Sequence, residues 1–279
     1  MDNNIEEPAR IPASSVMVLS SGNIINYSSL KRKIPQSSTE ELKLCLSGTF
    51  DSCLHQVDWD TEQLKESLEY AHPGPKYSPK VSRISEQRDA LKVTIKIMVS
   101  NIEIDVFTES ISRVTQEMAI ERIDTILLAM PEKPNEELLS MDHFKPIWKG
   151  LEHLVLEGKV DKLGVCDLDK NMLEQLCEWA TVKPVINQIN LAVCCVIPPE
   201  LSEFAKANSI QLLTHSDARE VLPADVFRGV IQNFFTAKDA MGWYPSWVLR
   251  YTVLIKNRGI VTTKGYIVRA QRILPVYED

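Results

Sequence analysis

The residues of this chain that could carry chemistry are thiols, lysines and a histidine that lie far apart in the sequence. The most reactive candidate is the pair Cys194-Cys195, which follows a predicted strand. Such a pair could be redox-sensitive or face a partner protein, but adjacent cysteines seldom bond to each other because disulfide geometry is awkward across one peptide. Free cysteine is also among the most buried residue types. Two interpretations therefore stay open: a regulatory thiol pair, and a pair of buried apolar residues.

Two further polar residues stand in or beside predicted strands. Lys96 interrupts an alternating apolar strand, so we expect an inward-facing lysine paired with Asp124 or Asp167. His215 ends a short apolar strand, where it could line a ligand pocket or serve as a hydrogen-bonded structural residue. Three aromatic residues could either anchor an interface or fill a core: Trp243, Tyr244 and Trp247.

The composition excludes several classes of function. The six cysteines show neither CxxC nor Cys/His spacing, so we expect no metal and no disulfide framework. The 279 residues carry a formal net charge of -7, which argues against nucleic acid or an anionic membrane as partners. No apolar run reaches the roughly 18 residues of a membrane span. The polar residues 1–10 lack the core of a signal peptide, so we expect a cytoplasmic protein.

The elements that must position these residues alternate along the chain. Period-two alternation or short apolar runs predict strands at 91–99, 123–130, 162–166, 184–191, 210–214 and 260–263. Apolar residues at helical spacing predict helices at 111–118, 144–155, 170–180, 199–208, 247–256 and 266–273. Asp169 is a suitable N-cap for the helix that follows it.

Repeated strand-helix units predict an α/β fold with a parallel sheet, because each crossover returns to the same edge. At this length a (β/α)₈ TIM barrel is the most economical closure. An open doubly wound sheet is the alternative, weakened by the absence of GxGxxG or a phosphate-binding Gly-Lys-Ser/Thr loop. We expect a flexible N-terminal arm at 1–15 and a single barrel domain at 16–279. That domain has a degenerate N-terminal third and a long surface loop at 72–85.

Several short blocks recur in an order that resembles the aldo-keto reductases. They are Gly158-Lys159-Val160, Gly164 to Leu168, Leu173 to Leu176, Lys183-Pro184, Asn187-Gln188, Leu249-Arg250-Tyr251, Arg258 to Val261 and Thr263-Lys264-Gly265. The resemblance runs from about residue 91 to 270. It implies a barrel whose functional mouth lies at the C-terminal ends of the strands.

The resemblance implies a reductase site that has lost its chemistry. Lys96 and Gln188 match the family's lysine and glutamine, but Ala129 stands where the family has a histidine. Cys166-Asp167 replaces a Ser-Asn pair, and His215 falls near the position of the cofactor-stacking tyrosine. The family's acidic tyrosine and its aspartate have no counterpart near Thr49 to Asp58. Without a tuned acid a general acid-base step loses about 10² to 10⁴ in rate.

Lys264 and Arg269 fall where the reductases hold the 2′-phosphate of NADP. With a helix predicted to begin beside Lys264, this could be an anion site. The resemblance therefore leaves two alternatives open. The chain could bind NADP(H) without turnover and act as a sensor, or it could be a working NADPH-dependent carbonyl reductase.

The chain resembles a non-catalytic branch of this family over nearly its whole length. The runs 21–33, 164–184, 187–201, 210–217 and 246–267 are similar to the regulatory (modifier) subunits of glutamate–cysteine ligase. That resemblance implies a non-enzymatic protein that forms a heterodimer with the ligase's catalytic subunit in the cytoplasm. It also implies that the partner then uses glutamate at lower concentration and resists feedback inhibition by glutathione. No cofactor is required for that role.

Overall fold

The computed structural model describes residues 11, 16–32, 34–55, 69, 71–73, 88–99, 104–130, 140–192 and 196–273. Most of the predicted N-terminal arm, residues 74–85 of the predicted surface loop, and the pair Cys194-Cys195 lie outside these residues. Within the described parts of the chain, no helix has both the length and the apolar character needed to cross a bilayer.

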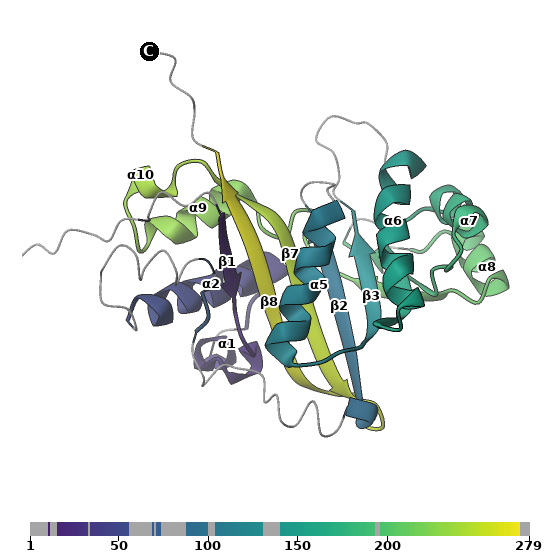
Figure 1. Cartoon of the computed structure of the whole chain (residues 1–279), viewed down its shortest axis with the longest axis horizontal. Coiled ribbons are helices and arrows are strands. Elements are labelled where there is room, and N and C mark those ends of the chain that lie inside the picture. Colours follow the sequence, from purple (N-terminus) through teal and green to yellow (C-terminus); the bar gives the residue numbers. More distant parts are fainter. Residues whose placement is uncertain are drawn as a thin grey trace, which may run out of the picture.

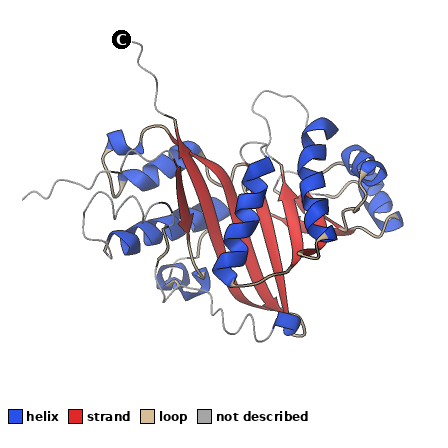
Figure 2. Cartoon of the chain, in the orientation of Figure 1, coloured by secondary structure: helices blue, strands red, loops and turns tan. Residues whose placement is uncertain are grey.

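Among the residues that the structure describes, eight strands form one sheet in the order β1-β8-β7-β2-β3-β4-β5-β6 (Figures 1 and 2). Their bounds are β1 Val16–Ser20, β2 Leu91–Val99, β3 Ile123–Ala129, β4 Val160–Cys166, β5 Ile186–Asn190, β6 Gln211–His215, β7 Trp243–Ile255 and β8 Ile260–Arg272. Strands β2 to β6 are parallel, whereas β7 pairs antiparallel with both β2 and β8, and β8 pairs antiparallel with β1.

Helices cover both faces of this sheet. Their bounds are α1 Ser28–Arg32, α2 Ser38–Leu54, α5 Ile104–Met118, α6 Met141–Leu156, α7 Lys170–Trp179, α8 Pro199–Ala207, α9 Ala224–Gln232 and α10 Ala237–Ala240, with short 3-10 turns at Ile24–Asn26 and Arg88–Ala90. The predicted N-cap is present: the Asp169 carboxylate accepts a hydrogen bond from the Met172 N–H at the start of α7. Figure 1 shows α5 in front of the sheet and α2 behind it.

Two hydrophobic cores follow from the strand alternation. Val93, Ile95 and Ile97 of β2 belong to a core that also contains buried residues of α5, α6 and α7. On β8 the alternating Tyr266, Val268 and Ala270 belong to a second core with α2 and α9. Because β-strand side chains alternate between faces, one sheet separates the two cores. The larger core covers the parallel strands, and the smaller one covers β1, β7 and β8 on the other face.

The α/β prediction is confirmed, and the strands and helices between residues 91 and 214 correspond to the predicted ones. Closure into an all-parallel eight-stranded barrel is not confirmed, since β1, β7 and β8 run antiparallel to their neighbours. Among the described residues, β6 pairs with β5 alone.

The helices predicted at 247–256 and 266–273 are wrong: both segments belong to the long hairpin of β7 and β8. The physical reason is burial on both faces. Buried residues occupy consecutive positions from Pro245 to Leu249 and from Gly265 to Val268, so no period of two marks these parts of the two strands. Trp243 and Trp247 are fully buried, which contradicts the interface-anchor interpretation and confirms the core one for these two residues.

Gly265 lies where another segment crosses β8 closely. A Cβ at this position would overlap the Gly22 carbonyl oxygen and the Tyr251 hydroxyl. Since both atoms belong to packed elements, neither can move away cheaply. This contact explains why glycine follows Lys264 in this chain.

We expect Gly265→Ser to lower the free energy of unfolding by about 3 kcal/mol, because overpacking forces backbone shifts. Urea denaturation followed by circular dichroism measures the change. Gly229→Ala is the matched control, since nothing lies within 4 Å of a Cβ added there. A Gly265→Ser chain as stable as the Gly229→Ala chain would contradict the proposed close packing.

Candidate functional site

A cluster of charged side chains lies at the C-terminal ends of the parallel strands, on the face opposite α5. Lys96 of β2 donates to the Oδ2 of Asp217 at 2.8 Å and to the Oε1 of Gln188 on β5 at 3.0 Å. In a flat sheet β2 and β5, three strands apart, would be separated by about 14 Å. The contact between their side chains therefore requires the parallel strands to curl strongly towards one another.

Asp217 is the centre of this cluster. Its two carboxylate oxygens accept hydrogen bonds from the Arg250 guanidinium of β7 at 2.6 and 3.0 Å, in bidentate geometry. Asp217 thus pairs with two cations, Lys96 and Arg250, whose side chains are themselves largely shielded from water. Burial acts to raise the pKa of Asp217, but hydrogen bonds from His215 and Arg250 and the charges of Arg250 and Lys96 hold it well below its usual range.

His215 lies between two carboxylates. Its Nε2 is 3.0 Å from the Asp167 Oδ2, and its Nδ1 is 3.3 Å from the Asp217 Oδ2. When the ring is neutral with its proton on Nε2, Nδ1 can accept the Asp217 backbone N–H at 3.2 Å. Burial acts to lower the pKa of His215, but the hydrogen bonds with Asp167 and Asp217 outweigh it and raise the pKa above its ordinary value.

Local backbone geometry explains the aspartate at position 167. Asp167 has a φ of 61°, in the left-handed region that aspartate and asparagine tolerate better than most side chains. Its carboxylate accepts the Asn190 N–H at 2.7 Å, and the Asn190 side chain donates to the Asp217 backbone carbonyl at 2.9 Å. The loops after β4, β5 and β6 are thereby joined into one hydrogen-bonded rim.

Cys166 completes the inner wall of the site. Its thiol lies 3.7 Å from the Gln188 Oε1, and it packs in a small apolar cluster with Leu127 and Ile186, against which Ala129 also packs. Burial, more than any neighbouring charge, raises the pKa of Cys166 to about 11. The thiol is therefore protonated at neutral pH and is a poor nucleophile.

This arrangement pairs Lys96 and Arg250 with one carboxylate and so stabilises the fold. The resembling reductases use a tyrosine as the acid and a histidine beside it, and here Ala129 stands at the position of that histidine. Lys96, the family's lysine, is engaged by Asp217 and Gln188. The cluster thus forms a charge-neutralising network across β2, β5, β7 and the loop after β6.

The structure brings five predicted site residues together: Lys96, Cys166, Asp167, Gln188 and His215. The predicted partners of Lys96 are wrong, because its carboxylate is Asp217, whereas Asp124 pairs with Arg88 and Lys256. Asp217 and Arg250 were missed as site residues. Asp217 could have been proposed from its position two residues after His215, whereas no neighbouring residue in the sequence indicated Arg250.

The residues predicted to hold a nucleotide phosphate do not form a cradle. Lys264 and Arg269 both belong to β8, and five residues of separation place their side chains on opposite faces. Lys264 pairs with Glu41 of α2 at 2.6 Å, and Arg269 pairs with Glu109 of α5 at 2.8 Å. The expected helix N-terminus beside Lys264 is absent because this segment is a strand. These residues therefore do not fit the phosphate of NADP(H).

Within the described part of the chain, no group of three or more acidic, histidine or cysteine side chains could hold a metal ion.

We expect Asp217→Asn to lower the free energy of unfolding by about 3–5 kcal/mol, because it leaves Lys96 and Arg250 shielded from water without a counter-charge. Chemical denaturation near neutral pH measures the loss. Asp169→Asn removes the same charge from a helix N-cap where asparagine serves equally well, so it should be nearly neutral. Equal stability of the two variants would show that the Asp217 network contributes little.

The His215 contribution should depend on pH. Because the folded chain raises its pKa, the stabilisation is fully present below about 6.5 and is lost as the pH rises through the raised value. We expect His215→Gln to destabilise the chain more at about pH 6 than at about pH 8.5, on either side of the titration range. Denaturation of both proteins at the two pH values tests this; a pH-independent difference would contradict the ion-pair interpretation.

One family model and two solved structures match parts of the chain. The model of the aldo/keto reductase family matches residues 80–217. An aldo/keto reductase of Brucella melitensis is 24% identical and aligns with 44% of this chain and 45% of its own, with a TM-score of 0.37. The aldose reductase of Giardia lamblia is 18% identical and aligns with 64% of this chain and 53% of its own, with a TM-score of 0.36.

Curated relatives match over much greater lengths. The glutamate–cysteine ligase regulatory subunits of Mus musculus and Homo sapiens are each 36% identical to the chain over 268 residues, which is 95% of this chain and 96% of each relative. A putative glutamate–cysteine ligase regulatory subunit of Schizosaccharomyces pombe is 27% identical over 75% of this chain and 80% of its own. The chain therefore belongs to the family of the glutamate–cysteine ligase regulatory subunits, and its residues 80–217 match the aldo/keto reductase family model.

Proposed function

We propose that this chain is a non-catalytic regulatory subunit that binds the catalytic subunit of glutamate–cysteine ligase in the cytoplasm. In this proposal, binding lowers the partner's apparent KM for glutamate and relieves its feedback inhibition by glutathione. The observation that carries the proposal is the 36% identity with named regulatory subunits over 95% of the chain. No cofactor takes part in this role.

The geometry of the charged cluster supports the non-catalytic part of the proposal. The lysine that a reductase would use is bonded to Asp217 and Gln188, and Ala129 carries no proton to donate. Asp217 stays ionised because its pKa is held below the usual range by His215 and Arg250 against the opposing effect of burial. A carbonyl group placed here would meet two cations, Lys96 and Arg250, that already pair with the Asp217 carboxylate.

A protein without chemistry of its own can still change an enzyme's kinetics. It must bind one conformation of the catalytic subunit more tightly than another. A tenfold change in apparent glutamate affinity corresponds to about 1.4 kcal/mol of coupling free energy. A few interface contacts can supply that difference, and no residue of this chain has to enter the partner's active site.

The test mixes the purified full chain with the purified catalytic subunit. We expect the two to co-elute in gel filtration. Initial rates at varied glutamate concentration should show an apparent KM several-fold lower than for the catalytic subunit alone, and glutathione should inhibit the mixture less. The isolated chain should oxidise no NADPH in the presence of aldehydes.

Each contrary outcome removes a different part of the proposal. Absence of co-elution and of any kinetic effect would overturn the regulatory assignment. Co-elution with unchanged kinetics would reduce the role to a scaffold. Steady NADPH oxidation by the chain alone would favour the carbonyl reductase instead.

A further inference from the structure

The exposed face of α6 has a composition that helix stability does not explain. Pro146 lies inside the helix, and Gly150 follows it four residues later on the same face. An internal proline removes a helix hydrogen bond and costs about 3 kcal/mol, and glycine costs about 1 kcal/mol relative to alanine. Two unfavourable residues on one face of one helix call for a reason outside the helix itself.

Packing does not supply that reason. Nothing lies within 4 Å of a Cβ added at Gly150, so no neighbouring segment requires glycine there. Its φ is not in the left-handed region either, because the glycines with positive φ are at other positions. Both residues are exposed. The missing side chain therefore leaves open space at the surface.

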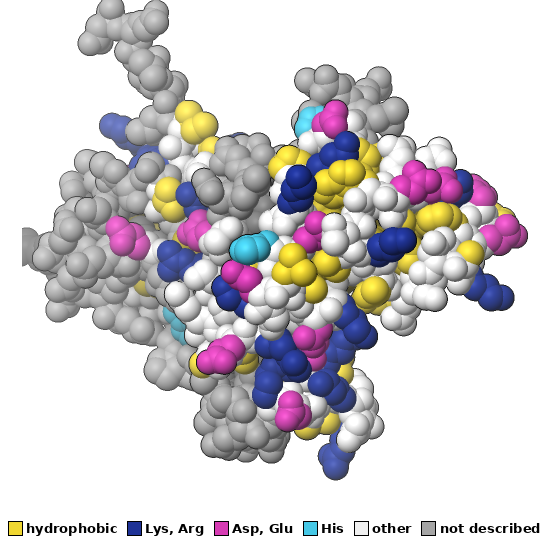
Figure 3. Space-filling model, turned by 45° about the vertical axis from the view of Figure 1, so that its right-hand side comes forward, with side chains coloured by type: hydrophobic (Ala, Val, Ile, Leu, Met, Phe, Trp, Pro, Cys, Tyr) yellow, Lys and Arg dark blue, Asp and Glu magenta, His cyan; other side chains and the backbone are white. Residues whose placement is uncertain are grey.

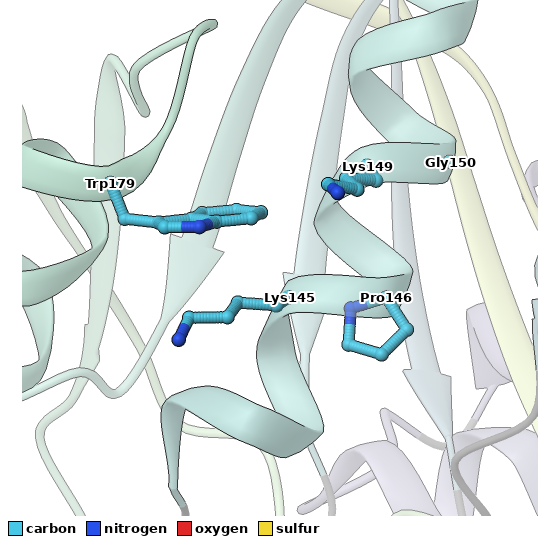
Figure 4. A pocket seen from close by; sticks show the side chains of 5 residues that line it. All are labelled: Lys145, Pro146, Lys149, Gly150 and Trp179. Carbon is cyan, nitrogen blue, oxygen red and sulfur yellow. The ribbon is translucent and has the colours of Figure 1, made fainter.

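That space is a shallow hollow of about 600 Å³ between α6 and the end of α7. Lys145, Pro146, Lys149 and Gly150 line it from α6, and Trp179, the last residue of α7, faces them. Figure 4 shows the indole ring extending towards α6, with Lys145 and Lys149 on the facing side. The Lys145 ammonium lies 6.0 Å from the centre of the indole ring. Figure 3 shows basic side chains beside hydrophobic ones on the face that carries α6 and α7.

The charge of the hollow is opposite to that of the chain. The whole sequence carries a formal net charge of -7, yet the two charged residues that line the hollow are both lysines. The carboxylate paired with Lys145 is Asp142, at 3.5 Å, with a side chain that is 91% exposed. Exposed pairs of this kind contribute at most about 1 kcal/mol, so an incoming carboxylate can replace Asp142 at little cost.

We propose that this hollow, formed by Lys145, Pro146, Lys149, Gly150 and Trp179, docks an acidic segment of the ligase's catalytic subunit. The segment places an apolar side chain on the indole in the space left by Gly150, and its carboxylates face Lys145 and Lys149. A large aromatic side chain beside two cations is the composition that anchors interfaces. This inference rests on the proposed function and assigns it a surface on the outer helices, away from the charged cluster.

Two variants of the full chain test the surface. Lys145→Glu/Lys149→Glu reverses its charge, and Gly150→Leu fills its space. We expect each to weaken binding to the purified catalytic subunit at least tenfold by isothermal titration calorimetry. The effect of the charge reversal should shrink as salt is raised, because exposed charges are screened. Gly150→Leu should not lower the unfolding free energy, since leucine favours the helix more than glycine does.

Lys43→Glu/Lys206→Glu is the matched control, because both lysines are exposed, lie on α2 and α8, and give the same change in net charge. The control should bind within about twofold of the wild type, since lone exposed charges contribute little. If both test variants bind like the wild type, this surface is not the docking site, although the proposed function stands. If the wild-type chain itself does not bind, both proposals fail.

A different occupant would give a distinguishable result. Sedimentation of the chain alone measures whether two copies associate through this face. A dimer that is lost in both test variants, with binding to the catalytic subunit unchanged, would assign the surface to a second copy and overturn the proposal. A monomeric wild type with partner binding that fails in both variants supports it.

Discussion

The structure depends on one buried carboxylate. Asp217 follows β6, at one end of the sheet, yet it bonds to Lys96 of β2 and Arg250 of β7 in the middle of the sheet order. Those contacts exist only because the parallel strands curl until the β6 end returns towards β2. Cations shielded from water need a counter-charge, so the curl and the ion pairs require each other. Ion pairs thus connect the first parallel strand, β2, with the loop after the last one, β6. In a closed barrel, backbone hydrogen bonds would connect the first and last strands.

This use of Asp217 connects the fold with the proposed loss of catalysis. In the resembling reductases the lysine supports a tyrosine that acts as the acid, and the glutamine helps to position the cofactor. Here the same positions are occupied by a network that also includes Gln188 and His215. Because Lys96 pairs with this structural carboxylate, its removal would leave Asp217 with one cation fewer. The family's catalytic geometry and this chain's structural geometry therefore compete for the same side chains.

The part of the fold in which each element has its own periodicity is predictable from the sequence. The alternation from β2 to β6 and the Asp169 cap are local signals, and they identify these elements correctly. Strands β7 and β8 were predicted wrongly because burial on both faces conceals their period of two, and the phosphate site expected at Lys264 and Arg269 was wrong for the same reason. Family resemblance located five residues of the cluster. Asp217 and Arg250 were missed because their pairing arises from the curl of the sheet, which no single segment encodes.

The ion pairs at the strand ends make the outer helices the better place for recognising a partner. Groups at the strand ends already satisfy one another, so a partner that bound there would have to break internal ion pairs before gaining new ones. On α6, Pro146 and Gly150 lower helix stability, no neighbouring group requires glycine at position 150, and the carboxylate that pairs with Lys145 is exposed. Groups on this surface make weak interactions with one another, so little free energy is lost when a partner replaces those interactions with its own. Since a tenfold kinetic effect needs only about 1.4 kcal/mol, such a surface is sufficient without any change inside the domain.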